Sequence, residues 1–169
     1  FNVVMLIKEI GAKVIFKDNI VDILKAKKNT TEENGMRNAH IRDGVALTKF
    51  IYWIKNTKNN SQTEISASNY LDKLRSKNEN FFSLSFPTIA GSGPNGAIVH
   101  YRASNKTNRK LKKDDLFLVD SGAQYFDGTT DVTRTIAFSK VTYEQKKMYT
   151  LVLKGHIAVA LSTFNEKES

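Results

Sequence analysis

Two aspartates, Asp120 and Asp131, lie where two hydrophobic strand patterns meet, and their carboxylates could bind a metal ion. The apolar run 116–119 leads into Asp120, and Asp131 opens the Thr/Val/Ile-rich stretch 132–138, which together predict a β-hairpin. A carboxylate at the end of a buried strand must be paired, hydrogen-bonded or bound to a metal, because an isolated buried charge is too costly. A metal site at this hairpin is one hypothesis, and two solvated acids flanking a loop are the alternative.

The register of the hairpin decides between these hypotheses. If a tight turn is centred on residues 127–128, the partner of Asp120 is residue 135, and Asp131 lies roughly 13 Å away along the strand. If the hairpin pivots at 125–126, Asp120 faces Asp131 with Cβ atoms about 5 Å apart. Facing carboxylates repel unless cations lie between them, so the metal hypothesis predicts the second register.

Composition narrows the class of protein. The chain has 169 residues, of which 40% are hydrophobic, and it has no cysteine, which excludes disulfides and thiolate chemistry. The net charge of +9 comes from dispersed basic residues without an aromatic-interleaved stripe, so we expect no nucleic-acid binding. No apolar stretch approaches the length of a membrane span, and we expect no membrane association and a cytoplasmic location. The chain begins with Phe1 rather than Met, which suggests a piece of a longer protein.

Helical and strand patterns alternate along the chain and predict an α+β fold. We expect a long helix that begins at a capping box at Thr30 or Thr31, with Glu33 or Asn34 as its second member. The other expected elements are a helix and a strand within 1–17, a connection over 18–29, a helix from Thr63, a strand over 81–86, a strand over 97–101, and a helix with the capping box Thr142 to Gln145.

The histidines are the other candidates for chemistry. His100 ends the predicted strand 97–101, where a structural role is the alternative to a functional one. His40 and Asp43 lie near Arg37 at helical spacing, and solvated ion pairing explains that pattern. We expect His156 to be packed or on the surface. The Gly91–Gly93 loop has no following Gly-Lys-Ser/Thr, so a phosphate-binding loop is rejected.

Five motifs in order over residues 29–165 resemble the aminopeptidase P (Xaa-Pro aminopeptidase) branch of the pita-bread metallopeptidases. The motifs are Gly35-Met-Arg-Asn-Ala-His-Ile-Arg-Asp43, Thr63-Glu-Ile-Ser-Ala67, Leu84-Ser-Phe-Pro-Thr-Ile89, Gly93-Pro-Asn-Gly-Ala-Ile-Val-His-Tyr101, and Val119-Asp-Ser-Gly-Ala-Gln-Tyr125 with Asp127-Gly-Thr-Thr-Asp-Val-Thr-Arg-Thr135.

The resemblance implies an incomplete pita-bread domain, with an antiparallel β-sheet and flanking helices. It implies that residues 1–28 are the tail of a preceding creatinase-like domain or a linker, and that 29–169 are the N-terminal half of the catalytic domain. Family members remove the N-terminal residue of peptides with proline at the second position, using two divalent ions, usually Mn2+ and sometimes Zn2+. By motif, Asp120 and Asp131 correspond to metal ligands and His100 to the histidine that contacts substrate.

The resemblance also implies what this chain lacks. The family's other metal ligands, one histidine and two glutamates, come from the second half of the domain, so three of the five are missing here. We therefore expect a truncated protein that is inactive alone, unless a homodimer or the missing C-terminal half completes the site. The alternative is a degenerate, non-catalytic peptide- or protein-binding fragment.

Overall fold

The computed structural model describes residues 2–17, 19–57 and 62–163. The polar stretch 56–62, which the sequence predicts as a loop, lies partly outside these ranges. The elements are α1 (Val3–Glu9), α2 (Ile20–Ala26), α3 (Thr30–Asn56), α4 (Glu64–Arg75), β1 (Phe81–Leu84), β2 (Ile89–Ser92), the 3-10 helix η1 (Gly93–Ala97), β3 (Leu116–Ser121), β4 (Ala123–Tyr125), β5 (Gly128–Thr129), β6 (Val132–Ala137) and α5 (Tyr143–Ala160).

The strands form two small antiparallel sheets that share one hairpin. One sheet has the order β2-β3-β6 and the other has the order β1-β4-β5. Strands β3 and β4 follow one another with only Gly122 between them, so the hairpin from β3 to β6 passes through both sheets. The mixed content of helices and antiparallel strands confirms the predicted α+β class.

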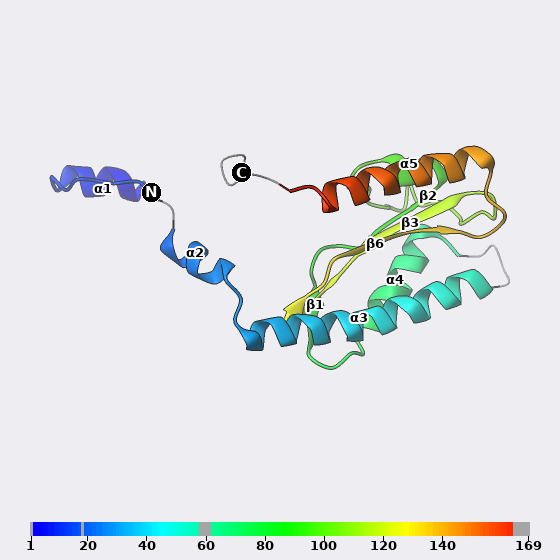
Figure 1. Cartoon of the computed structure of the whole chain (residues 1–169), viewed down its shortest axis with the longest axis horizontal. Helices are drawn as coiled ribbons and strands as arrows, with labels where there is room; N and C mark the ends of the chain where they lie inside the picture. The colour runs from blue at the N-terminus through cyan, green and yellow to red at the C-terminus, as the bar shows by residue number, and fades with distance from the viewer. Residues whose placement is uncertain (1, 18, 58–61, 164–169) are drawn as a thin grey trace.

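The core lies between helices α3 and α4 and the sheet β2-β3-β6, and alternation along β3 decides which side chains enter it. Phe117, Val119 and Ser121 are buried, and the first two pack against Phe50 of α3 and Leu71 of α4. The alternate residues of β3 point to the other face, because side chains alternate along a strand. Figure 1 shows the strands between α5 on one side and α3 with α4 on the other. Asp120 therefore lies on the face away from the core helices.

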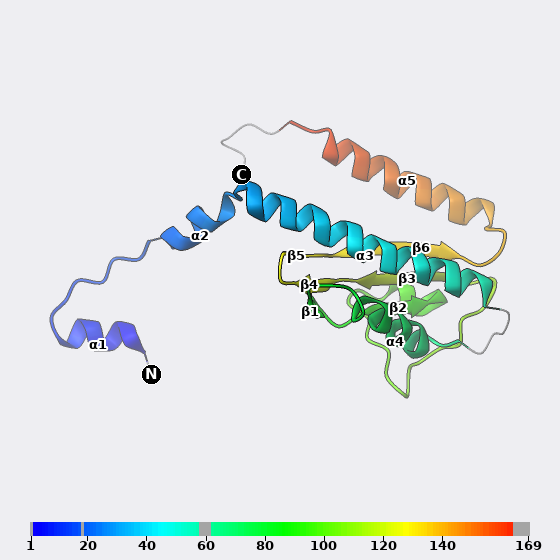
Figure 2. The ribbon, with the colours of Figure 1, turned by 90° about the horizontal axis from the view of Figure 1, so that it is seen from below.

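Helices α1, α2 and α5 contribute no buried residue. Helices α1 and α2 extend away from the body of the structure in both views (Figures 1 and 2). Helix α5 lies over the second face of the sheet, where its residues Gln145 and Tyr149 line a hollow with Leu116 and Thr135. No helix in the described ranges is long and apolar enough to cross a membrane.

Four expectations differ from the structure. The capping box of α3 uses Asn29 and Glu32 rather than the threonines that follow, since Glu32 is correctly placed to bond the Asn29 backbone. Residues 97–101 form no strand, because the 3-10 helix η1 ends at Ala97 and a turn follows. The segment 18–29, expected as a connection, contains α2, and no strand forms among the described residues of 1–17. The capping boxes at Thr63 and Thr142 are present, the latter as predicted.

Candidate functional site

A hollow of about 400 Å3 brings together the three residues that the sequence selects for chemistry. It is lined by Phe86, Pro87, Ile89, His100, Arg102, Asp120 and Asp131. These residues come from the segment after β1, from β2, from the turn after η1, from β3 and from the connection between β5 and β6. Residues up to 45 positions apart in the chain thus meet at one place, on the sheet face opposite α3 and α4.

The observed hairpin register lies midway between the two that the sequence allows. Asp120 pairs with Thr133 and Ser121 with Val132, while Tyr125 pairs with Gly128. The turn is therefore centred on residues 126–127. Both predicted registers are wrong by one residue at the turn, and Asp131 would stand opposite Gly122 if the same register continued.

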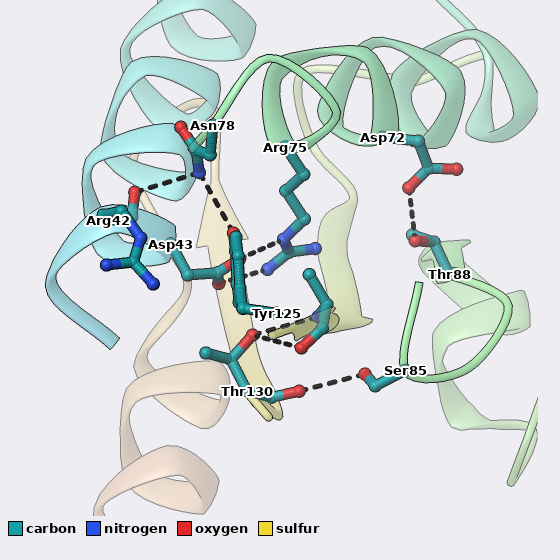
Figure 3. Close-up of polar contacts among 10 residues, drawn as sticks. Arg42, Asp43, Asp72, Arg75, Asn78, Ser85, Thr88, Tyr125 and Thr130 are labelled. Atoms are coloured by element: carbon teal, nitrogen blue, oxygen red, sulfur yellow. Dashed lines mark hydrogen bonds and ion pairs between the residues drawn. The ribbon is translucent and has the colours of Figure 1, made fainter. Parts of the chain in front are cut away.

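Close packing at Gly122 fixes the position of Asp131, and Figure 3 shows the hydrogen bond between Ser85 and Thr130 beside this crossing. A Cβ at Gly122 would collide with the Thr130 carbonyl oxygen and with Ser85 Oγ, so only glycine fits there. Thr130 is buried and its Oγ1 accepts a hydrogen bond from the Ala123 backbone N–H at 2.9 Å. Ser85 Oγ donates to the Thr130 carbonyl at 2.9 Å, which ties the end of β1 to this crossing. Asp131 follows directly and is exposed in the hollow.

Asp120 is half-buried and has a defined orientation. Its Oδ1 accepts a hydrogen bond from Thr133 Oγ1 at 2.7 Å, and its backbone is paired with Ile89 on one side and Thr133 on the other. The carboxylate is therefore held by a central strand. Its Oδ2 has no hydrogen-bond partner among the residues that the structure describes, and can accept a ligand.

His100 reaches the hollow from a turn and not from a strand. Its φ angle of 53° lies in the left-handed region, which is uncommon for a residue with a Cβ. The Tyr101 backbone N–H donates to the Ile98 carbonyl at 3.2 Å, which closes the turn around His100. The predicted strand is wrong, and His100 lines the same hollow as the two aspartates.

Arg102 is a member of the hollow that the sequence analysis missed. It is exposed and forms no ion pair among the described residues, although two carboxylates share the hollow with it. Its position two residues after His100 is the feature of the sequence that could have identified it as a site residue. A guanidinium here favours a negatively charged group in the hollow and disfavours a cation.

The donors present fit a divalent metal in kind but not in number. Two carboxylates and an imidazole line the hollow, yet no group of three or more His, Cys, Asp or Glu side chains among the described residues is arranged to hold a metal ion. A divalent ion with oxygen ligands such as Mn2+ prefers about six of them. The hollow alone is therefore an incomplete metal site.

Asp43, expected in a solvated ion pair, is instead at the centre of a buried network (Figure 3). Its Oδ1 accepts from Arg75 Nε at 2.7 Å and from the Tyr125 hydroxyl at 2.8 Å, while Oδ2 accepts from Arg75 Nη2 at 2.8 Å. Asn78 Nδ2 donates to the Tyr125 hydroxyl at 3.0 Å. The solvated interpretation is wrong for Asp43, and this network fixes the hairpin tip to α3 and α4.

The other histidines are peripheral. His40 is exposed and its Nδ1 lies 2.8 Å from the Met36 carbonyl oxygen. His156 is exposed on α5, which is the surface alternative of the two positions expected for it. Neither residue lines the hollow.

Tyr125, Asp127 and Asp72 have perturbed pKa values with clear physical causes. Burial raises the pKa of Tyr125 to about 12, and the hydrogen bond to Asp43 adds to this effect, whereas the bond from Asn78 opposes it. The hydrogen bond from Arg42 lowers the pKa of Asp127 at the turn. Burial raises the pKa of Asp72, whose Oδ1 accepts from Thr88 Oγ1 at 2.7 Å.

Comparisons with known proteins agree with the resemblance. Residues 34–165 match the model of metallopeptidase family M24. The chain is 52% identical over 143 residues to the probable Xaa-Pro aminopeptidase P of Paracoccidioides brasiliensis, covering 83% of this chain and 23% of that protein. It is 46% identical over 147 residues to the Drosophila melanogaster Xaa-Pro aminopeptidase ApepP, covering 86% and 24%. The chain thus spans about a quarter of the length of these relatives.

The fold is also that of a solved relative. The X-prolyl aminopeptidase of Caenorhabditis elegans, described as a cytosolic enzyme with a di-nuclear active site, superimposes with a TM-score of 0.77 at 42% identity. The match covers 82% of this chain and 23% of that one. The predicted α+β, pita-bread class is confirmed for the part of the fold that this chain presents.

Proposed function

The chain belongs to metallopeptidase family M24, and on this premise we propose that it forms part of the active centre of a Xaa-Pro aminopeptidase. The observation that carries the proposal is the hollow, which gathers His100, Asp120 and Asp131 from three separate segments. Relatives named as Xaa-Pro aminopeptidases support the proposed substrates, which are peptides with proline at the second position.

We assign the two carboxylates to metal binding and the imidazole to substrate binding. Asp120 presents its free Oδ2, and Asp131 presents an exposed carboxylate from the neighbouring connection. Divalent ions in such a centre polarise a scissile carbonyl and lower the pKa of a bound water. The left-handed turn presents His100 to the same hollow, where it can hydrogen-bond a peptide carbonyl.

The remaining ligands must come from outside the described residues. We propose that either a complementary polypeptide segment or a second copy of this chain supplies them, with Mn2+ as the favoured ion, Zn2+ as the alternative, and the cytosol as the site of action. The C. elegans neighbour, described as cytosolic and di-nuclear, supports the location and the ion count.

A second candidate function is peptide binding without hydrolysis. It is favoured by the absence, within the described ranges, of a set of three or more metal-ligating side chains. Both candidates use the same hollow, and they differ in whether bound peptide is cleaved.

Mn2+ binding tests the assignment of the carboxylates directly. Mn2+ is paramagnetic, so NMR signals near the hollow, including the Ile89 amide and the His100 imidazole, should broaden at low Mn2+ concentrations. We expect weak, single-ion binding, because two carboxylates supply a minority of the ligands that Mn2+ prefers. Asp120→Asn should remove the broadening, whereas the exposed Asp22→Asn on α2 should not.

Hydrolysis of a Xaa-Pro peptide with added Mn2+ separates the two candidate functions. No turnover by the folded chain alone is expected, and turnover lost in Asp120→Asn would show that a second copy completes the site. Broadening that survives Asp120→Asn, or sub-micromolar binding of two ions, would contradict the proposed assignment.

A further inference from the structure

One buried carboxylate outside the hollow accepts an unusually large number of hydrogen bonds. Glu64 begins helix α4 and is 0% exposed. Its Oε1 accepts from the Ser92 backbone N–H at 2.8 Å and from Asn95 Nδ2 at 3.0 Å. Its Oε2 accepts from the Tyr101 hydroxyl and from the Arg109 backbone N–H, both at 2.9 Å. A buried carboxylate is tolerated because such donors replace water.

The donors flank the segment that carries His100. Ser92 ends β2 and Asn95 lies within η1, so both precede the turn, while Tyr101 is the residue directly after His100. Glu64 therefore holds both ends of residues 93–100 against the start of α4. Asn95 Nδ2 also donates to the Tyr101 hydroxyl at 2.7 Å, which links the two ends to each other.

The conformation of His100 requires such support. A residue with a Cβ occupies positive φ at a free-energy cost, and it stays there when the surrounding structure leaves it no alternative. The residues just before it do not provide this support, because the Ile98 and Val99 side chains are 54% and 82% exposed. The anchored neighbour is Tyr101, which is 6% exposed and bound to Glu64.

We propose that Glu64 is a positioning residue that fixes where the His100 imidazole lies in the hollow. The functional meaning of this position rests on the proposed function, in which His100 binds the peptide substrate. The positioning itself does not depend on metal binding or catalysis, because Glu64 does not line the hollow.

Two variants test the proposal. Glu64→Gln keeps the shape of the side chain but replaces one acceptor oxygen with an N–H2 group. Since at least two donors point at each oxygen, either orientation of the amide leaves donors facing a donor. Tyr101→Phe is milder, because it removes a single hydroxyl, which joins the His100 turn to Glu64 and also contacts Thr107.

The chain has three histidines, so His40 and His156 serve as internal controls for His100 in the NMR measurement. In both variants we expect the His100 imidazole cross-peaks to shift. The cross-peaks of His40 on α3 and His156 on α5 should stay in place, and unchanged signals there show that the fold is intact. Tyr52→Phe, on the exposed face of α3, should move none of the three.

Unmoved His100 cross-peaks in the folded Tyr101→Phe variant would overturn the proposal, whether or not Glu64→Gln folds. Movement of all three histidines by equal amounts would also overturn it, because a general structural role predicts that result. Failure of Mn2+ to broaden wild-type signals would count against the proposed function and leave this histidine test unaffected.

Discussion

Replacing Asp43 should cost much more stability than replacing its neighbour Arg42, although each belongs to an Arg–Asp pair. The side chains of the Asp43–Arg75 pair are 3% and 0% exposed, whereas those of the Arg42–Asp127 pair are 22% and 28% exposed. Two adjacent positions on one helix thus provide a buried pair and a partly solvated pair for comparison.

The magnitude follows from what each substitution leaves behind. Asp43→Leu removes both acceptors of Arg75 and leaves a buried guanidinium without a counter-charge, which costs about 3–5 kcal/mol in the free energy of unfolding. It also removes the acceptor of the Tyr125 hydroxyl. Arg42→Met breaks a pair that water screens, worth up to about 1 kcal/mol. Its guanidinium lies 5.3 Å from the Tyr125 ring centroid, a contact that adds roughly 0.5–1 kcal/mol.

The double variant Asp43→Leu/Arg75→Met separates the value of the pair from the penalty of a lone charge. No buried charge remains, so most of the lost stability should return, to within about 2 kcal/mol of the wild type. Arg75 Nη1 has no hydrogen-bond partner within the described residues, which makes the wild-type pair less favourable than a fully satisfied one.

Urea unfolding, monitored by far-UV circular dichroism and by the fluorescence of Trp53, measures these differences. Trp53 is partly buried, stacks on Tyr70 and packs against the core. A loss below about 1 kcal/mol for Asp43→Leu, where a lone buried charge should cost several, would refute the argument. A double variant as unstable as Asp43→Leu alone would refute it as well.

Two further predictions concern the hairpin that carries the aspartates. Burial raises the pKa of Tyr125 to about 12 from an ordinary value of 10.0, so the neutral phenol stabilises the fold fully below about pH 10. That contribution, at most about 2.7 kcal/mol, should be lost as the pH rises through about 12, as measured by unfolding at each pH alongside Tyr125→Phe. Gly122→Ala should destabilise the chain by about 2 kcal/mol or more, because the added methyl meets the Thr130 carbonyl. Gly155→Ala in α5, where a Cβ meets nothing within 4 Å, should instead stabilise by roughly 0.5–1 kcal/mol, and equal losses at both glycines would contradict this explanation.

The helix boundaries were predictable where the signal is local. Thr142 and Gln145 form the expected capping box, and Thr63 begins α4, because each motif acts within one helical turn. The N-cap of α3 is Asn29 and not the predicted Thr30 or Thr31, because two capping patterns overlap in the sequence. Glu32 reaches the Asn29 backbone, and this decides between them.

The hairpin register was not predictable, because distant residues determine it. The sequence allowed a turn centred on residues 127–128 or a pivot at 125–126, and the observed turn lies between them. Ser85, 45 residues from Thr130, donates to its carbonyl, and Gly122 permits the close approach. Nothing in the local pattern reveals that contact.

Long-range partners also explain two wrong predictions, the solvated ion pair expected for Asp43 and the strand expected over 97–101. Arg75 lies 32 residues after Asp43 and on another helix, so spacing along α3 could only suggest solvated pairing. Residues 97–101 are apolar enough for a strand. Asn95 and Tyr101 instead donate hydrogen bonds to Glu64, and these bonds hold the segment as a 3-10 helix and a turn. Motif resemblance selected three residues that line one hollow, because it does not depend on their local secondary structure.

The hollow therefore depends on two separate supports. The aspartates are placed by strand pairing, with the crossing of Gly122 and Thr130 setting the position of Asp131. His100 is placed by Glu64, which bonds neither of these residues. Because the supports share no hydrogen bond, a change in one can leave the other intact. We therefore expect the proposed metal binding by the aspartates and the proposed substrate binding by His100 to be separable by mutation.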